Sequence, residues 1–291
     1  MFGSIETGGT KIICALLNEE GKILDKVSIP SLTPDQSMPA VISYFKDHPV
    51  EALGVGSFGP LDLHKESKTY GYITSTPKPG WKDYPLVPVL KDALHVPVGL
   101  DTDVNAALLG EVEFGAARGL DNAVYITIGT GIGGGVMTNG KLLHGMLHPE
   151  LGHMLLAKRE DDHFDGVCPY HGSCFEGLAS GPAIAARWGK PAEELSDCED
   201  VWNLEAFYIA QAITSYIMIL SPEKIVLGGG VMHQESLFPL IRKNVVEMVN
   251  GYIQASLLED MENYIVPSSL HDEQGILGGL ALARNALKEE H

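Results

Sequence analysis

A glycine-rich segment at residues 129–135 constrains the fold of this chain more than any other feature. It reads GTGIGGG and follows the apolar residues 124–128, which predict a β-strand. The letters fit the pattern G-x-G-x-x-G, which in dinucleotide-binding domains lies between a strand and a helix. Here the following residues read VMTNGKLL, and an Asn139-Gly140 pair between apolar runs predicts a hairpin that needs positive φ at both residues. The glycine segment therefore joins two antiparallel strands, which argues against a nucleotide-dependent oxidoreductase.

Such a turn has two interpretations. It is either a plain tight hairpin or an anion site, because glycines let backbone N–H groups approach a phosphate with no Cβ in the way. The N-terminus favours the second interpretation, because it repeats the design. Residues 3–6 predict a strand, Thr7-Gly8-Gly9-Thr10 a glycine turn, and residues 11–17 a second strand. The tetrapeptide GKIL at residues 21–24 is echoed by GKLL at residues 140–143. Two similar halves, each offering a phosphate loop to a shared cleft, are predicted.

Two carboxylates are placed between a predicted strand and a predicted helix. Residues 96–100 are apolar, residues 104–114 have helical spacing, and Asp101 and Asp103 lie at the junction. An aspartate with a pKa near its reference value of about 3.9 is ionised at neutral pH and can accept a proton. Asp103 is the candidate general base and Asp101 its nearest alternative. Either residue could instead be a helix N-cap.

A cluster of cysteine and histidine residues predicts a metal site. The segment CPYHGSC at residues 168–174 puts two thiolates and an imidazole on one tight loop, and zinc prefers these donors in a tetrahedron. His153 is the best fourth donor, with His148 and His163 as alternatives. A set of two cysteines and two histidines leaves no open position, which predicts a structural zinc ion. The alternative is a disulfide between Cys168 and Cys174, or two free thiols.

Composition limits the classes of partner and compartment. The chain of 291 residues has a net charge of −18, which argues against a nucleic-acid partner, because binding the phosphate backbone requires a basic surface. We find no membrane span and no signal peptide, and we expect a cytoplasmic protein. Four cysteines in a chain of this length do not suggest a secreted disulfide framework.

Patterning predicts the remaining elements. Helices are expected at residues 38–47, 84–94, 180–189, 201–220, 237–252 and 275–290, strands at residues 52–57, 224–227 and 263–267, and irregular structure at residues 69–81. The predicted domains are residues 1–118 and 119–271, with the C-terminal helix in residues 272–291 packing back on the first domain.

Several motifs in this order resemble the ROK family of sugar kinases and repressors. They are ETGGTK at residues 6–11, DTDVN at 101–105, the glycine segment at 129–135, ELGH at 150–153, the Cys/His loop and GGG at 228–230. The resemblance covers essentially the whole chain. The glycine turn begins within the first ten residues, leaving no N-terminal helix-turn-helix, so the kinase branch fits. The resemblance implies an α/β, actin-like (ribonuclease-H-like) fold with duplicated domains around a cleft.

Two differences from the usual motifs of this family indicate which group of its sugar kinases the chain resembles. Many members have Asp where this chain has Glu6, and many glucokinases have a three-cysteine motif in place of CPYHGSC. Both differences resemble the bacterial fructokinases of the family, which implies an ATP-dependent hexose kinase that makes fructose 6-phosphate. Glucose, mannose or an N-acetyl sugar is the alternative substrate. A sugar-sensing binding protein that has lost phosphoryl transfer is the alternative from another class.

The resemblance also implies roles for individual residues. Asp103 would be the base, Asn105 and Glu150 would bind sugar hydroxyls, and Glu176 could assist. Without the resemblance, Glu150 would be read as a solvated loop residue and Lys11 equally as a strand cap. Magnesium would bridge the ATP phosphates, His153 could serve both zinc and sugar, and the protein would be a homodimer. The residues expected to contact the nucleotide or its phosphates are Gly8, Gly9, Thr10, Lys11, Gly129, Thr130, Gly131, Pro182, Gly228, Gly229, Gly230, Val231 and Met232.

Overall fold

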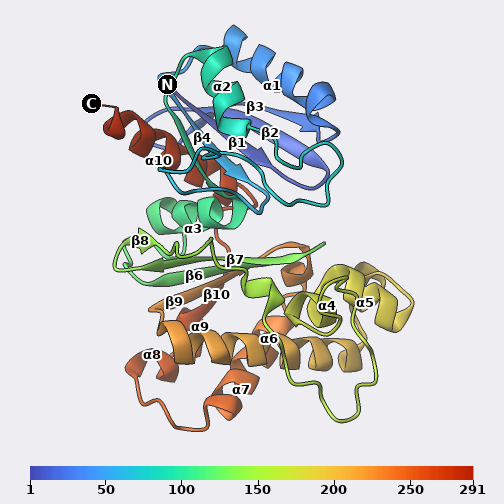
Figure 1. Ribbon diagram of the computed structural model, residues 1–291. Coiled ribbons are helices and arrows are strands. Elements are labelled where there is room, and N and C mark those ends of the chain that lie inside the picture. The colour runs from blue at the N-terminus through green and yellow to red at the C-terminus, as the bar shows by residue number, and fades with distance from the viewer. Residues whose placement is uncertain (291) are drawn as a thin grey trace. The chain divides into compact units, whose positions relative to one another are not determined.

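The computed structural model describes residues 1–290 and confirms the predicted α/β class (Figure 1). The chain divides into two compact units. Unit 1 contains Met1–Gly119, Leu142–Pro149 and the C-terminal segment from Leu270 onward, and unit 2 contains Leu120–Lys141 and Glu150–Ser269. The predicted boundaries differ mainly in residues 142–149, which they place with the second half of the chain, and by one or two residues at 119 and 270–271.

Unit 1 is built on a five-stranded sheet with the order β3-β2-β1-β4-β5. The first three strands form an antiparallel meander, and β4 and β5 continue the sheet in parallel with β1. The strands are β1 (Phe2–Thr7), β2 (Lys11–Leu17), β3 (Ile23–Pro30), β4 (Ala52–Ser57) and β5 (Val98–Thr102).

Both faces of this sheet are covered by helices. The helices of unit 1 are α1 (Pro34–Asp47), α2 (Leu86–Leu94), α3 (Asp103–Phe114) and α10 (Gln274–Glu289). Alternate residues of β2 point to opposite faces, as strand geometry requires. Ile12, Cys14 and Leu16 join the core formed with α1 and α2, whereas Ala15 and Leu17 pack in the core that contains α10. The C-terminal helix thus packs on β1, β4 and α3 within unit 1.

Unit 2 repeats the topology of unit 1. Its sheet has the order β10-β9-β6-β7-β8, in which β6 and β7 are antiparallel and β9 and β10 run parallel to β6. The strands are β6 (Ala123–Ile128), β7 (Ile132–Thr138), β8 (Lys141–Leu142), β9 (Lys224–Gly228) and β10 (Ile265–Pro267). Each unit is therefore a three-stranded meander followed by two parallel strands, and the predicted duplication is confirmed.

The helices of unit 2 include a long buried helix, α6, which packs against α7. They are α4 (Phe175–Ala179), α5 (Gly181–Trp188), α6 (Glu199–Leu220), α7 (Leu237–Val249), α8 (Ser256–Glu259) and α9 (Met261–Tyr264), with short 3-10 turns η1 (Leu151–His153), η2 (Ala192–Glu194) and η3 (Gly230–His233). The predicted hairpin is confirmed, because Asn139 and Gly140 have φ of 52° and 70° between β7 and β8.

Some predicted boundaries are wrong. Helix α1 begins at Pro34, before residue 38, because a proline is well tolerated in the first turn of a helix. Helix α7 ends at Val249, and Asn250 adopts the left-handed conformation that terminates it. The expected strand at residues 263–267 is shorter, since Asn263 belongs to α9.

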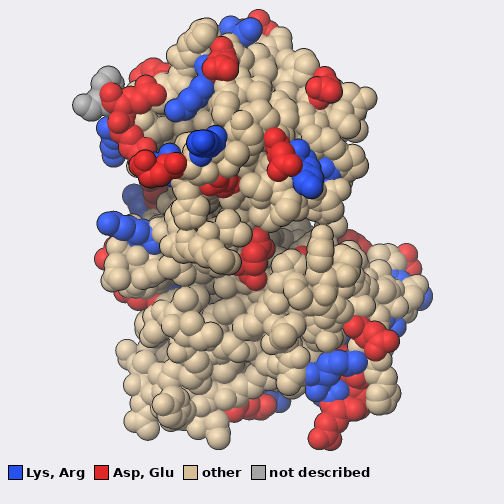
Figure 2. All heavy atoms as spheres, in the orientation of Figure 1, with Lys and Arg blue, Asp and Glu red and all other residues tan. Residues whose placement is uncertain are grey.

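Charged groups of both signs are mixed on the face of the molecule drawn in Figure 2. On the face drawn in Figure 2, Lys and Arg side chains form small separate groups among acidic ones. Among residues 1–290, no helix has both the length and the hydropathy that crossing a membrane requires.

Candidate active site and metal centre

The strand-to-helix junction of unit 1 separates the roles of the two aspartates. Asp101 lies inside β5 and is buried, and Asp103 is the first residue of α3. The N-cap of α3 is Thr102, whose hydroxyl accepts from the Asn105 N–H at 3.1 Å. The N-cap interpretation is therefore wrong for both aspartates. Asp103 is half-buried at the N-terminal end of α3, which is the positive end of the helix dipole.

Asn105 lies one helical turn from Asp101 and directly contacts it. Its Nδ2 donates to Asp101 Oδ1 at 2.7 Å, and the residue is 1% exposed. The Asn105 Oδ1 atom is buried and has no hydrogen-bond partner within residues 1–290. Because buried polar atoms are nearly always hydrogen-bonded, this acceptor is suited to a ligand hydroxyl.

The second oxygen of Asp101 accepts from His144, a residue that the sequence analysis missed. His144 Nε2 donates to Asp101 Oδ2 at 2.9 Å, and this hydrogen bond to the carboxylate raises the pKa of His144 above its usual value. His144 belongs to Leu142–Pro149, a segment that two further histidines hold in unit 1. His148 Nε2 accepts from the Leu61 N–H at 3.2 Å, and His64 Nε2 donates to the Met146 carbonyl at 2.9 Å.

The first glycine turn joins β1 to β2 and is supported by Lys78. The Gly8 N–H donates to the Lys11 carbonyl at 2.8 Å, while the Gly8 carbonyl accepts from Lys78 Nζ at 3.0 Å. The ammonium also contacts Ser31 Oγ and lies over the Phe58 ring at 4.5 Å from its centroid. Burial lowers the pKa of Lys78.

The surroundings of the first glycine turn show which side of it is open to a ligand. A Cβ on Gly9 would meet nothing within 4 Å, so a ligand can approach its backbone. The Glu6 side chain points toward α10, since its Oε2 would lie 2.5 Å from a Cβ on Gly275 in the first turn of that helix. Burial raises the pKa of Glu6. Trp81 anchors the irregular loop, because its buried Nε1 donates to the Leu32 carbonyl at 2.6 Å.

The second glycine turn joins β6 to β7 in unit 2. The Gly129 carbonyl accepts from the Gly181 N–H at 2.8 Å, which attaches the turn to the first residue of α5. Glu176 Oε2 accepts from the Ile132 N–H at 3.0 Å. Glu176, expected to assist in sugar binding, therefore contacts the backbone of the glycine turn.

A cavity of about 560 Å³ opens beside this second turn. Its volume falls within the range of small-molecule sites. The α5 N-terminus faces it, and a helix N-terminus favours phosphate. Five of the residues expected to contact the nucleotide line the cavity, namely Gly129, Thr130, Pro182, Gly230 and Val231, and Gly181, which was not expected, lies beside them. Residues that spacing did not identify complete the wall, namely Ala185, Pro191, Ala192, Glu193, Trp202, His233 and Gln234.

The remaining expected residues do not line the cavity. Gly131, Gly228, Gly229 and Met232 are not part of its wall. Gly229 has a structural reason to be glycine, because its φ is 88° and a Cβ would lie 2.4 Å from the Ile128 carbonyl oxygen.

The residues expected to contact the sugar are found in both units. Glu150 is exposed and precedes η1, and its carbonyl accepts from the His153 N–H at 3.1 Å. Asp103 and Asn105 thus belong to unit 1, and Glu150 and Glu176 to unit 2.

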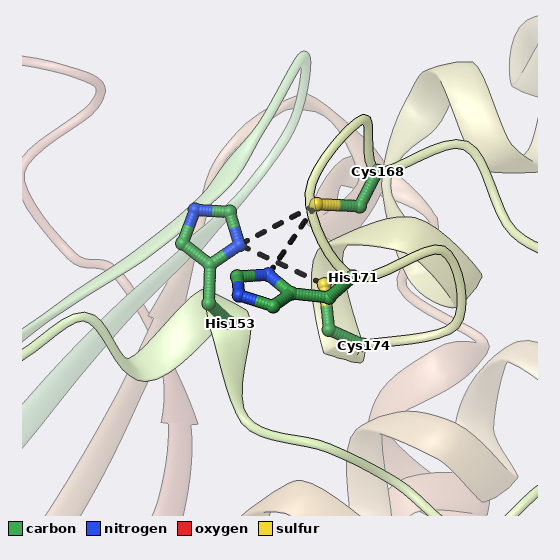
Figure 3. A group of neighbouring side chains, drawn as sticks. All are labelled: His153, Cys168, His171 and Cys174. Atoms are coloured by element: carbon green, nitrogen blue, oxygen red, sulfur yellow. Dashed lines mark hydrogen bonds between the residues drawn. The ribbon is translucent and has the colours of Figure 1, made fainter.

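The four residues of the predicted metal site come together in unit 2 (Figure 3). Cys168 Sγ is 3.8 Å from His153 Nδ1 and 3.7 Å from His171 Nδ1, and Cys174 Sγ is 3.6 Å from His153 Nδ1. Tetrahedral zinc with its usual bond lengths separates sulfur and nitrogen ligands by about 3.5–3.6 Å. The geometry therefore fits zinc.

Of the alternatives considered for this cluster, the disulfide is not observed. Both cysteines are free thiols, as the other alternative has it, and burial raises the pKa of Cys174 to about 11. His148 lies in unit 1 and bonds to Leu61, and His163 is not a member of the group.

Comparisons with known proteins agree with this architecture. The ROK family matches residues 2–286. The chain is 46% identical to a fructokinase from Pediococcus pentosaceus, with 99% of each chain covered. It is 44% identical to a fructokinase from Lactococcus lactis subsp. cremoris, again with 99% of each covered. A ROK hexokinase from Thermus thermophilus superposes with a TM-score of 0.81 at 28% identity, covering 99% of both chains. Each unit has the ribonuclease-H-like topology of actin-like proteins, and the chain belongs to the ROK family.

Proposed function

We propose that this protein is an ATP-dependent fructokinase that converts fructose and ATP into fructose 6-phosphate and ADP. The observation that carries the proposal is the β5–α3 junction, where a half-buried Asp103 lies two residues from the open amide acceptor of Asn105. Phosphoryl transfer needs a carboxylate that accepts the proton of the attacking hydroxyl, together with groups that position the sugar. Relatives named fructokinase at 44–46% identity favour fructose among the hexoses.

The proposed roles divide between the two units. Asp103 accepts the hydroxyl proton while Asn105 and Glu150 hold sugar hydroxyls. The cavity of unit 2 takes the nucleotide, with Thr130 and Pro182 at its wall. The two glycine turns bind phosphates through backbone N–H groups. Magnesium, when bound with ATP, would neutralise charge on the phosphates.

Glu176 has a more specific role than the one expected from sequence. Its carboxylate accepts from the Ile132 N–H, so it holds the second turn in shape. We propose that Glu176 keeps the second glycine turn in the shape that binds phosphate, in addition to assisting in sugar binding.

The Cys/His cluster is proposed to hold one structural zinc ion. The donor types and the sulfur–nitrogen separations of 3.6–3.8 Å support this assignment. Metal analysis after dialysis should find about one zinc ion per chain, because a closed tetrahedral set releases its metal slowly. A Cys168→Ser protein should lose the metal and melt at a lower temperature, with the exposed Cys198→Ser as the matched control. Full zinc content in Cys168→Ser would contradict the assignment.

The substrate is tested by measuring ADP release from Mg-ATP with fructose, glucose, mannose and N-acetylglucosamine in parallel. Fructose-dependent turnover that yields fructose 6-phosphate is expected. Faster turnover with another of these sugars would keep the kinase and change its substrate. No turnover with any sugar, together with retained sugar binding, would instead indicate a sensor. We further propose that the protein is cytoplasmic and forms a homodimer, and light scattering of the purified protein tests the oligomeric state.

A further inference from the structure

We propose that Asp101 and His144 are positioning residues that fix the side-chain amide of Asn105 so that its oxygen faces the sugar. This inference rests on the proposed function, because it assumes that Asn105 binds a sugar hydroxyl. It adds to that function two side chains from distant parts of unit 1.

The orientation of Asn105 follows from the chemistry of its partner. An asparagine amide carries a donor and an acceptor, and a half-turn about its terminal bond exchanges them. An ionised carboxylate can only accept. Because Asp101 Oδ1 lies 2.7 Å from Asn105 Nδ2, the nitrogen must face Asp101 and the oxygen must face away. The buried oxygen, without a partner within residues 1–290, then accepts from a hydroxyl of the substrate.

Asp101 is itself held at both oxygens. Oδ1 also accepts from the Thr102 N–H at 2.8 Å, and Oδ2 accepts from His144 Nε2 at 2.9 Å. With 4% of its surface exposed, Asp101 can take few of its hydrogen bonds from water. The imidazole therefore replaces the solvent that the second oxygen would otherwise need. Loss of His144 removes the donor to Oδ2, and the carboxylate is then held through Oδ1 alone, which fixes its orientation toward Asn105 less firmly.

His144 also stands in a segment that leads directly to Glu150. Leu142–Pro149 belongs to unit 1, and the next residue along the chain is the second proposed sugar ligand. The bond to Asp101 fixes one point of this segment, and the bond from His64 to the Met146 carbonyl fixes another. With the bond from the Leu61 N–H to His148, three histidines thus anchor the same segment, but of these only His144 contacts the carboxylate that orients Asn105.

This difference supplies a matched pair of variants, His144→Ala and His64→Ala. Steady-state kinetics should give a KM for fructose that rises about tenfold or more in His144→Ala, which loses a charge-assisted hydrogen bond. The KM for ATP should stay within about twofold, because the nucleotide cavity lies in unit 2. His64→Ala should resemble the wild type in both constants. His144→Gln, whose amide can donate to Asp101, should recover most of the fructose affinity.

Thermal melting of each variant shows whether it is folded. Two results would overturn the inference: an unchanged KM for fructose in a folded His144→Ala protein, or an equal loss in His64→Ala. Equal increases in the KM for ATP and for fructose would also overturn it, because they would indicate a purely structural role. If the wild type phosphorylates another sugar, the same comparison is made with that sugar. Wild-type protein that phosphorylates no sugar would refute the proposed function itself, which separates that failure from an unchanged KM in the variant.

Discussion

The two glycine turns share a backbone design but are supported by side chains of opposite charge. Both join antiparallel strands, with Thr7 opposite Ile12 in unit 1 and Ile128 opposite Ile132 in unit 2. In unit 1 the support is a cation, Lys78, on the Gly8 carbonyl. In unit 2 it is an anion, Glu176, on the Ile132 N–H. The comparison teaches that one backbone turn can be held by a cation on a carbonyl or by an anion on an N–H, and that the support decides which amides stay available.

The consequence can be followed through one peptide unit of each turn. In a trans peptide the C=O and the following N–H point in opposite directions. Lys78 draws the Gly8 carbonyl to its side, so the Gly9 N–H is directed to the other side. In unit 2, Glu176 uses the Ile132 N–H itself, and the α5 N-terminus provides the positive potential there. We therefore expect the first turn to depend on a side-chain cation and the second on a helix terminus.

The largest effect on stability is expected for a substitution of Gly229, which packs against the end of β6 beside the second turn. A Cβ there would lie 2.4 Å from the Ile128 carbonyl oxygen, and φ is 88°. Gly229→Ala should lower the free energy of unfolding by about 3 kcal/mol or more, through overlap and backbone strain. Gly189→Ala is the control, because its φ of 72° is similar but nothing lies within 4 Å, so about 1 kcal/mol of strain is expected. Urea denaturation measures both, and equal losses would contradict this explanation.

Removing the anionic support should have the next largest effect. Glu176→Ala leaves the Ile132 N–H without its acceptor, and kcat/KM should fall by about 10–100-fold, as for loss of a hydrogen bond to a charged group. Glu176→Gln keeps an acceptor oxygen and should lose less. Steady-state kinetics with ATP and fructose test the pair. A Gln variant as impaired as the Ala variant would show that the charge, and not the hydrogen bond, supports the turn.

Removing the cationic support should be milder and confined to the nucleotide. Lys78→Met keeps the apolar stem beside Phe58 and Trp81 but loses the donor to Gly8. The KM for ATP should rise about tenfold, with the KM for fructose little changed. An increase only in the KM for fructose would break the comparison, because Lys78 would then support the sugar side of unit 1.

The smallest effect on stability is expected at Gly9. Alanine there meets no atom within 4 Å and φ is not positive, so Gly9→Ala should change the free energy of unfolding by less than about 0.5 kcal/mol. Its new methyl group should nevertheless weaken binding of ATP, because it occupies the space beside the turn. Calorimetric titration with ATP measures this. Unaltered ATP affinity would show that no phosphate approaches Gly9.

Local patterning could predict the backbone of both units. Alternating apolar runs, glycine turns and the Asn139-Gly140 pair specify the two meanders, because these signals act between neighbouring residues. The Cys/His loop can also be predicted from sequence, since most of its donors share one tight segment. The side chains that support the sites cannot be predicted in this way. Lys78 and His144 reach their partners only through tertiary packing, and no spacing in the sequence connects His144 with Asp101.

The same limit applies to the helix cap and the cavity wall. Thr102, Asp101 and Asp103 all suit an N-cap, and only the observed hydrogen bond to the Asn105 N–H selects Thr102. Trp202 lines the cavity of unit 2 from α6, a helix whose sequence predicts only a buried helix. The roles of Thr102 and Trp202 depend on which hydrogen bonds form and which side chains line a cavity. The apolar periodicity of the sequence predicts neither.

In the proposed mechanism Asp103 accepts the proton of a sugar hydroxyl during transfer from ATP. The most direct test compares kcat with fructose and calorimetric fructose binding in wild type and Asp103→Asn. If Asp103 is the base, kcat should fall by about 10²–10⁴-fold, the usual contribution of a general base, while the Kd for fructose changes by less than about threefold, since an amide still hydrogen-bonds to a hydroxyl. Turnover at the wild-type rate in Asp103→Asn would show that another group accepts the proton.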